Sequence, residues 1–379
     1  MTPVVIAGYA RSPFHVAHKG ALAKVRPDDL LAEVLKGLVA RTGVPGEAIE
    51  DVIVGTAFPE GEQGLNIARM AVFLAGLPEN VGGVTVNRFC GSSMQAIPMA
   101  AGAIQLGSGE AFVCAGIESM TRVPMTGFNP MPSPVLMAEY PQAYMAMGET
   151  AENVARKYQV TREDQDRFGF ESQQKAARAA AAGRFADEIV PITLKDGSTV
   201  DSDGTIRADT TLDGLAGLKP AFIEDGSVTA GTSSPLTDGA AATLVCTEAF
   251  AREHGLTPLA RVLATAVSGC PSEIMGIGPV GATRKVLQRA GIGVDDLDVI
   301  ELNEAFAAQA LATMRDLDLD PAKTNLDGGA IALGHPLGAS GARITGKAAS
   351  LLQREGGRYA LSTMCIAGGQ GIATVLEAA

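Results

Sequence analysis

The sequence predicts an α/β fold, because short β-branched runs alternate with Ala- and Leu-rich stretches of helical period. Residues 4–6 and 52–54 are typical of strands, and residues 30–40 between them are typical of a helix. A further strand is expected at residues 111–113, after a helix that follows Cys90. The strand runs are almost wholly apolar, which indicates that both faces of the sheet are covered.

A second series of the same kind occupies the later part of the chain. Strands are expected at residues 259–267, 298–302 and 359–363, with helices near residues 283–290 and from Ala305 onward. This repetition of order is the second observation that supports the α/β prediction.

The two series also share a local pattern of a Gly/Ser turn, a helix and a strand of small residues. A Gly/Ser turn and a helix follow Cys90 and lead to a small-residue strand at residues 112–116. A similar turn and helix follow His335 and lead to residues 363–368. We interpret this as an internal duplication, in which two facing halves bring their strand-to-helix elbows together at one shared site.

The predicted halves span residues 1–250 and 255–379, and the first contains an excursion at about residues 119–227. Prolines and methionines crowd the start of this excursion, and a polar helical stretch follows at residues 150–182. We interpret it as an inserted loop domain that covers a ligand with adaptable Met side chains. A surface elaboration without ligand contact is the alternative.

Length and composition exclude several classes of protein. With 379 residues, 46% of them hydrophobic, the chain is long enough for a large core rather than a small binding module. A formal net charge of −12 argues against a nucleic-acid or anionic-membrane surface. Neither a signal peptide nor a membrane span is indicated. Five cysteines without a Cys-x-x-Cys pair favour neither disulfides nor zinc, so a reducing cytoplasm is the expected location.

Cys90 is the leading candidate for a nucleophile. It stands between a strand-like run and a helix, where free backbone N–H groups of the first helical turn favour the thiolate. An inert buried cysteine is the alternative. Three other cysteines lie in or beside apolar runs and are expected to be structural; these are Cys114, Cys246 and Cys270.

Three further residues stand in settings that suit catalysis. His335 lies among glycines that let backbone approach a ligand. Cys365 precedes a Gly-rich run whose amides are free to face a developing negative charge. Asn303 follows a strand, where helix capping is the competing explanation. Neither a dinucleotide fingerprint nor a phosphate loop is present, which disfavours redox and phosphotransfer chemistry.

Taken together, these motifs resemble the thiolase family, and the similarity covers nearly the whole chain in the family's order. The resemblance implies a thiolase-like five-layer αβαβα sandwich made of two duplicated halves, with an inserted loop domain and a dimeric or tetrameric assembly. The motifs that carry it are residues 86–96, 229–242, 303–307, 328–341 and 365–371.

The resemblance also implies roles for single residues. Cys90 corresponds to the residue that becomes acylated, His335 to its activator and Cys365 to the proton shuttle. Asn303 corresponds to the holder of a water in one oxyanion hole, and the backbone N–H groups of Cys90 and Ala367 to a second hole. Coenzyme A is implied as co-substrate, with no bound cofactor and no metal. Its contacts are expected at Arg207, Phe222, Ala230, Ser234, Leu236 and Phe306.

The expected reaction is thiolytic cleavage of 3-ketoacyl-CoA by CoA through an acyl-cysteine intermediate. Acetoacetyl-CoA thiolases typically carry His-Met-Gly in the loop domain, whereas this chain has Ala-Met-Gly at residues 146–148, which favours the β-oxidation type. The alternatives are an acetoacetyl-CoA thiolase working in the condensing direction, a ketoacyl synthase or hydroxymethylglutaryl-CoA synthase relative, and a non-catalytic acyl-CoA or lipid-binding relative. A homodimer or homotetramer is expected, and a multifunctional β-oxidation partner is possible.

Overall fold

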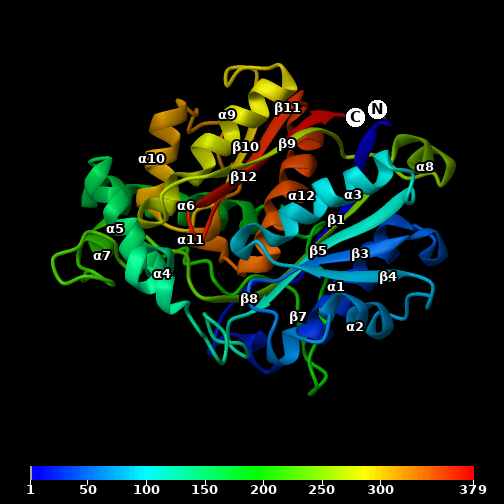
Figure 1. Cartoon of the computed structure of the whole chain (residues 1–379), viewed down its shortest axis with the longest axis horizontal. Helices are drawn as coiled ribbons and strands as arrows, with labels where there is room; N and C mark the ends of the chain where they lie inside the picture. Colours follow the sequence, from blue (N-terminus) through cyan, green and yellow to red (C-terminus); the bar gives the residue numbers. More distant parts are fainter. Residues whose placement is uncertain (1) are drawn as a thin grey trace.

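The computed structural model describes residues 2–379 and has five layers, which follow one another from bottom to top in Figure 1. The strands of the first half form one part of the sheet and those of the second half form the other. The first set comprises β1 (Val4–Arg11), β2 (His15–Val16), β3 (Asp51–Gly55), β4 (Gly82–Val86), β5 (Ala111–Ser119) and β8 (Thr237–Thr247). The second set comprises β9 (Ala260–Gly269), β10 (Val299–Leu302), β11 (Tyr359–Ile366) and β12 (Gln370–Ala378).

The strand order is β10-β11-β12-β9-β1-β8-β5-β3-β4. Only two residue pairs join β1 to β9, so the ten strands act as two sheets that meet along one short seam. The order repeats on either side of the seam. The strands β3-β5-β8-β1 of the first half correspond to β10-β11-β12-β9 of the second. In the place of β4, the second half has only a parallel bridge between Ile300 and Thr324. The duplication predicted from the sequence is therefore visible in the topology.

Helices form the outer and middle layers. The outer face of the first sheet carries α1 (Pro27–Thr42) and α2 (Ile67–Leu74), and that of the second carries α9 (Gly278–Ala290) and α10 (Ala307–Leu317). The middle layer is α3 (Ser92–Gln105) and α12 (Leu337–Glu355). Shorter helices are α8 (Glu248–Glu253) and α11 (Ala330–Leu333).

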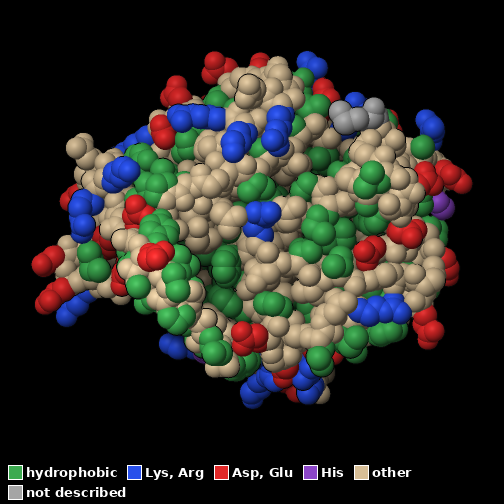
Figure 2. All heavy atoms as spheres, in the orientation of Figure 1, with side chains coloured by type: hydrophobic (Ala, Val, Ile, Leu, Met, Phe, Trp, Pro, Cys, Tyr) green, Lys and Arg blue, Asp and Glu red, His purple; other side chains and the backbone are tan. Residues whose placement is uncertain are grey.

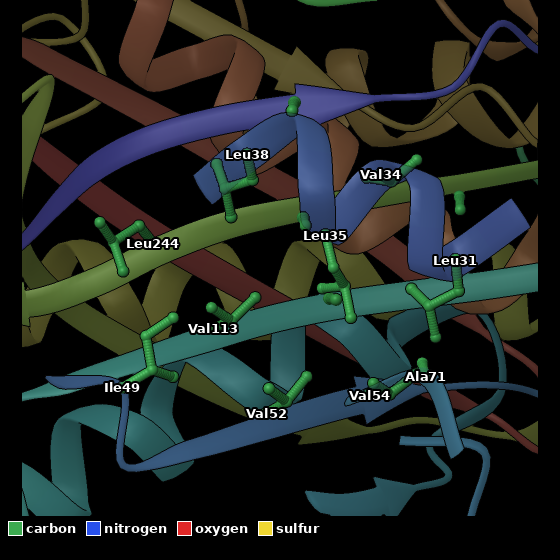
Figure 3. Close-up of a cluster of buried hydrophobic side chains, with 14 of the residues drawn as sticks. Leu31, Val34, Leu35, Leu38, Ile49, Val52, Val54, Ala71, Val113 and Leu244 are labelled. Carbon is green, nitrogen blue, oxygen red and sulfur yellow. The ribbon is translucent and has the colours of Figure 1, made fainter. Parts of the chain in front are cut away.

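Three apolar cores hold these layers together. Figure 3 shows the first, where Leu31, Leu35 and Leu38 of α1 pack on Val52 and Val54 of β3. The 3.6-residue period of the leucines places them on one helix face, which is why this segment forms an amphipathic helix. The middle core joins both sheets to α3 and α12, and the third core lies beneath α9 and α10.

The segment between β5 and β8 forms the loop region at the left of Figure 1. The polar helical stretch expected at residues 150–182 is two helices, because Gln159 adopts a φ of 53° between them and Thr161 caps the second. The elements of the region are α4 (Pro134–Glu139), α5 (Met147–Lys157), α6 (Arg162–Ala181), β6 (Ile192–Thr193), β7 (Thr199–Val200) and α7 (Leu212–Ala216). Across residues 2–379, no helix has the length and apolar character needed to cross a membrane.

Candidate active site

Cys90 lies in a single 3₁₀ turn, Phe89–Gly91, between β4 and α3. The sequence suggested that the strand runs up to Cys90, but β4 ends at Val86. The chain then turns sharply, with Phe89 at a φ of 44° and its N–H donating to the side chain of Asn87 over 2.8 Å. This turn places the Cys90 side chain in the interior, where it is 7% exposed.

His335 lies between α11 and α12 and makes three polar contacts. Its backbone N–H donates to Thr237 Oγ1 over 3.0 Å. Ring atom Nδ1 lies 2.6 Å from Ser340 Oγ, and Nε2 lies 3.4 Å from Asn303 Nδ2. The preceding Gly334 has a φ of 95°, which only glycine adopts readily, so the imidazole is aimed by a backbone turn that needs this residue.

Close backbone contacts bring the two elbows together. A Cβ at Gly341 of α12 would overlap the backbone nitrogen of Met94 in α3. A Cβ at Gly91 would lie 2.6 Å from Ile366 Cδ1, at the end of β11. In addition, Ala342 N–H donates to Ser93 Oγ over 2.8 Å. The glycines that the sequence analysis noted are therefore required where α3, α12 and β11 meet.

Cys365 lies one residue before the end of β11 and is 1% exposed. Burial raises the pKa of its thiol, and Cys90 raises it further. The next residue, Ile366, packs against Gly91, which follows Cys90. On its other side, Cys365 belongs to an apolar cluster with Met275 and Phe306, against which Met147 packs.

The two backbone donors expected for an oxyanion hole both face Cys90. The N–H groups of Ala367 and of Cys90 itself lie near its sulfur and lower the pKa of the thiol. Positive φ angles in this loop begin at Gly368, with 76°, and continue at Gly369, with 79°. Ala367 therefore needs no special backbone conformation to present its N–H.

The expectation of a thiolate at the elbow is wrong for the free protein. Burial raises the pKa of the Cys90 thiol to about 12 and outweighs the backbone donors. Burial, and then the charge of Arg343, lower the pKa of His335 to about 3. At neutral pH the site thus holds a neutral thiol and a neutral imidazole, and the charged pair forms only during reaction.

Glu118, at the end of β5, is a residue that the sequence analysis missed. Its buried carboxylate accepts from Ala57 N–H and Gly338 N–H, each over 2.8 Å, and from Gln63 Nε2 over 2.7 Å. It therefore holds the first turn of α12 against the end of β3. Burial raises the pKa of Glu118, and its charge contributes to the raised pKa of Cys90. The sequence did contain a signal for this residue, because a Glu directly after a run of small strand residues is expected to be buried.

The site residues form two groups. His335 contacts Asn303 directly, while Cys90 and Cys365 lie on neighbouring segments that meet where Gly91 packs against Ile366. Two residues connect these groups. Leu337, two residues after His335, packs against the apolar cluster that contains Cys90. Glu118 accepts from Gly338 N–H, three residues after His335. Asn303 follows β10 directly and is fully buried, and its Oδ1 has no partner.

The residues expected to contact coenzyme A fall in two places. Residues 232–234 run beside 305–307, and Ser234 N–H donates to Ala305 O over 3.0 Å. The rings of Phe222 and buried Phe306 pack edge to face with centroids 5.8 Å apart, while Ala230 and Leu236 are exposed near this strip. Arg207 is exposed elsewhere, and its N–H donates to Gln173 Oε1.

Of the other cysteines, only Cys270 adjoins the site, because its N–H donates to Gly369 O over 2.7 Å in the loop after Cys365. Cys114 and Cys246 are fully buried in the sheet, Cys270 is half-buried, and all five cysteines are free thiols. In the part of the chain that the structure describes, no group of His, Cys, Asp and Glu side chains is arranged to hold a metal ion.

Comparison with known proteins gives consistent matches over the full chain. The family model for the thiolase N-terminal domain matches residues 4–249, and that for the thiolase C-terminal domain matches residues 256–378. A 3-ketoacyl-CoA thiolase of Bacillus subtilis is 46% identical, with 100% of both chains covered. A 3-oxoadipyl-CoA/3-oxo-5,6-dehydrosuberyl-CoA thiolase of Escherichia coli is 48% identical, covering 94% of this chain and 95% of that one. The crystal structure of human mitochondrial 3-ketoacyl-CoA thiolase in complex with CoA superposes with a TM-score of 0.92 at 39% identity, covering 100% of this chain and 98% of that one.

Proposed function

The chain belongs to the thiolase family, and we propose that it is an acetyl-CoA C-acyltransferase that cleaves 3-ketoacyl-CoA with CoA. The products are acetyl-CoA and an acyl-CoA shortened by two carbons. The observation that carries the assignment is that the segments of Cys90 and Cys365 meet where Gly91 packs against Ile366. His335, between α11 and α12, is hydrogen-bonded to Asn303, which follows β10.

In the first half-reaction His335 Nε2 takes the proton of Cys90, and the sulfur attacks the 3-keto carbon. The bond between the α and β carbons then breaks, which leaves an acyl group on Cys90 and a carbanion beside the thioester of acetyl-CoA. Cys365 gives its proton to this carbanion. The N–H groups of Cys90 and Ala367 stabilise negative charge on the oxygen bound to the attacked carbon.

In the second half-reaction the thiolate of Cys365 takes the proton of incoming CoA. The CoA sulfur attacks the acyl group, and Cys90 leaves and recovers its proton from His335. The cycle needs no metal or redox partner, because the two thiols and the imidazole supply every proton transfer. Asn303 Oδ1 is buried without a protein partner, which supports its assignment as the holder of a water.

The acyl-cysteine is tested by mass spectrometry of protein mixed with 3-ketoacyl-CoA in the absence of CoA. We expect an added acyl mass on the peptide that contains Cys90, and loss of both the adduct and thiolysis in Cys90→Ala. Cys246→Ala is the matched control, because Cys246 is a buried thiol in the core beneath α1 and α2. Thiolysis retained by Cys90→Ala, with melting unchanged, would refute the assignment.

We place the reaction in the degradative direction because residues 146–148 read Ala-Met-Gly. The chain is proposed to comprise halves at residues 1–250 and 255–379, with the loop domain at about residues 119–227 in the first. A reducing compartment fits a mechanism in which Cys90 and Cys365 must both remain thiols.

We also propose that the protein works as a homo-oligomer built on β4. This strand ends the sheet order, so its outer edge offers backbone groups to a second copy. Apolar side chains lie near it: Leu65 is 89% exposed, Met99 of α3 is 38% exposed, and Leu106, directly after α3, is 85% exposed. Figure 2 shows hydrophobic side chains over the part of this face where α3 and β4 lie.

Sedimentation of Leu65→Asp tests this assembly. We expect the dissociation constant of the oligomer to rise by at least about tenfold, because a charge would be buried at the interface. Leu212→Asp in α7 is the matched control, because Leu212 is 45% exposed on the loop region. Unchanged assembly in Leu65→Asp would remove this edge from the proposed interface.

A further inference from the structure

Ser340 is the side chain in closest contact with the His335 ring. Its Oγ lies 2.6 Å from His335 Nδ1 and 3.1 Å from the carbonyl oxygen of Pro336. Ser340 is 1% exposed, so water does not compete for these bonds. It belongs to the first turn of α12, and the next residue is Gly341, whose contact with Met94 fixes this turn in place.

The hydrogen-bonding capacity of these groups selects one arrangement of protons. The carbonyl of Pro336 can only accept, so the Ser340 hydroxyl donates to it and offers a lone pair to His335 Nδ1–H. A proton on Nδ1 leaves the lone pair of Nε2 facing Asn303 Nδ2, which is a donor at 3.4 Å. The opposite tautomer would set two donors against each other at Nε2.

We propose that Ser340 is a positioning residue that holds His335 with its proton on Nδ1, so that Nε2 is free to accept the proton of Cys90. The inference rests on the proposed role of His335 as the base. When Nε2 gains the proton, Nδ1–H keeps Ser340 Oγ as its acceptor, so the hydrogen bond on that side of the ring is retained during the transfer. A serine performs here the orienting task that a carboxylate performs in Ser-His-Asp triads.

A neutral partner also has an electrostatic consequence. A buried carboxylate at this position would favour the imidazolium and keep Nε2 protonated before substrate arrives. The charged neighbour of His335 is instead Arg343, which is fixed by Glu301 at 3.1 Å and opposes the imidazolium. Serine thus orients the ring without raising its basicity in the resting protein.

The test combines ¹⁵N NMR of labelled histidines with kinetics on the full-length protein. Comparison with His335→Gln identifies the two ring signals of His335. We expect the wild-type protein to show the tautomer protonated at Nδ1, and Ser340→Ala to shift toward protonation at Nε2. We expect kcat to fall about 10–100-fold in Ser340→Ala with little change in the KM for CoA, because Ser340 is buried beneath the ring.

Ser350→Ala is the matched control, because Ser350 Oγ also bonds the carbonyl four residues earlier in α12, over 3.0 Å, but lies beyond the site. It is expected to retain the wild-type rate and tautomer. A wild-type ring protonated at Nε2, or a Ser340→Ala variant with wild-type rate and signals, would overturn the inference even if His335→Gln is inactive. An active His335→Gln would instead overturn the proposed function of His335. If Ser340→Ala does not fold, the wild-type tautomer alone decides.

Discussion

The two halves of the molecule share one strand order, but they differ in the parallel strand at the outer edge of each sheet. In the first half β3 pairs with a full neighbour, β4, over five residues. In the second half the corresponding neighbour of β10 is reduced to one bridge, between Ile300 and Thr324. There a side chain completes the pairing, because Asn325 Oδ1 accepts from Leu302 N–H and its Nδ2 donates to Leu302 O, each over 2.9 Å.

This difference fits our proposal that the first half provides an edge for assembly and the second half provides groups for catalysis. The complete strand of the first half leaves a free edge beside the nucleophile elbow. The shortened one lets Asn325 also donate to Glu304 Oε1 over 2.7 Å, and Glu304 follows Asn303 directly. Ser172 and Ile331 N–H donate to the same carboxylate, so this loop is held from three sides. In the proposed mechanism the first half supplies the acyl acceptor, and the second half supplies the groups that move protons.

The proposed division of chemistry between the two halves is tested most strongly by removing the thiol of Cys365. Cys365→Ala should lower thiolysis about 10³-fold or more, because the carbanion loses its acid, while Cys90 still accepts an acyl group from a simple acyl-CoA. Labelled acyl transfer onto Cys90 and full thiolysis are to be measured in parallel. Equal loss of both reactions would show that the two halves do not divide the chemistry.

The elbow of the first half is tested by alkylation across pH. Because burial raises the pKa of Cys90 to about 12, the folded protein keeps the proton that an unfolded chain releases near pH 9. The contribution of Cys90 to folding stability is therefore present below pH 9 and lost as pH rises toward 12. The rate of iodoacetamide labelling of the free protein should rise about tenfold per pH unit from about pH 8 to about pH 10. A plateau below pH 8.5 would indicate a thiolate poised by the helix.

The junction between the halves is tested with a matched pair of glycines. Gly341→Ala places a methyl group on the Met94 backbone and should cost about 1–3 kcal/mol in the free energy of unfolding, with reduced activity. Gly102→Ala in α3 meets open space and should instead stabilise by about 0.5–1 kcal/mol. Chemical denaturation measures both. Similar values for the two variants would mean that the contact does not hold the elbows.

The smallest expected effects come from substitutions at the two sheet edges, at Asn325 beside β10 and at Thr85 in β4. Asn325→Ala removes buried hydrogen bonds at Leu302 and Glu304 and should cost about 1–3 kcal/mol. Thr85→Val in β4 removes an exposed bond from Thr85 Oγ1 to Asn66 Oδ1 and a long one, of 3.4 Å, from Ala68 N–H to Thr85 Oγ1, and should cost about 0.5 kcal/mol or less. Thermal melting measures the difference. A greater loss in Thr85→Val would reverse the order of importance inferred from the comparison.

Much of the fold was predictable because its signals are local. Apolar runs located the strands β1, β3 and β5, and the period of Leu31, Leu35 and Leu38 located α1. The short seam between β1 and β9 was not predictable, because two residue pairs leave no pattern. The break between α5 and α6 was missed because Gln159 gives no sign that it adopts a positive φ.

The site was predictable as a set of residues but not as an electrostatic environment. Gly-rich motifs pointed to Cys90, His335 and Cys365, whereas the sign of the Cys90 pKa shift depends on burial by layers far away in sequence. Glu118 and Ser340 escaped notice for the same reason. Each acts on a partner that only tertiary structure supplies.

The central position of α12 has a consequence for biosynthesis. Residues 337–355 emerge late from the ribosome, yet they cover the inner faces of β1, β5 and β8, which are made first. The nascent first half therefore waits with an uncovered apolar surface until nearly the entire polypeptide has been translated. Such a delay makes folding slow and exposes the intermediate to aggregation, so productive synthesis is expected to benefit from chaperones that shield that surface.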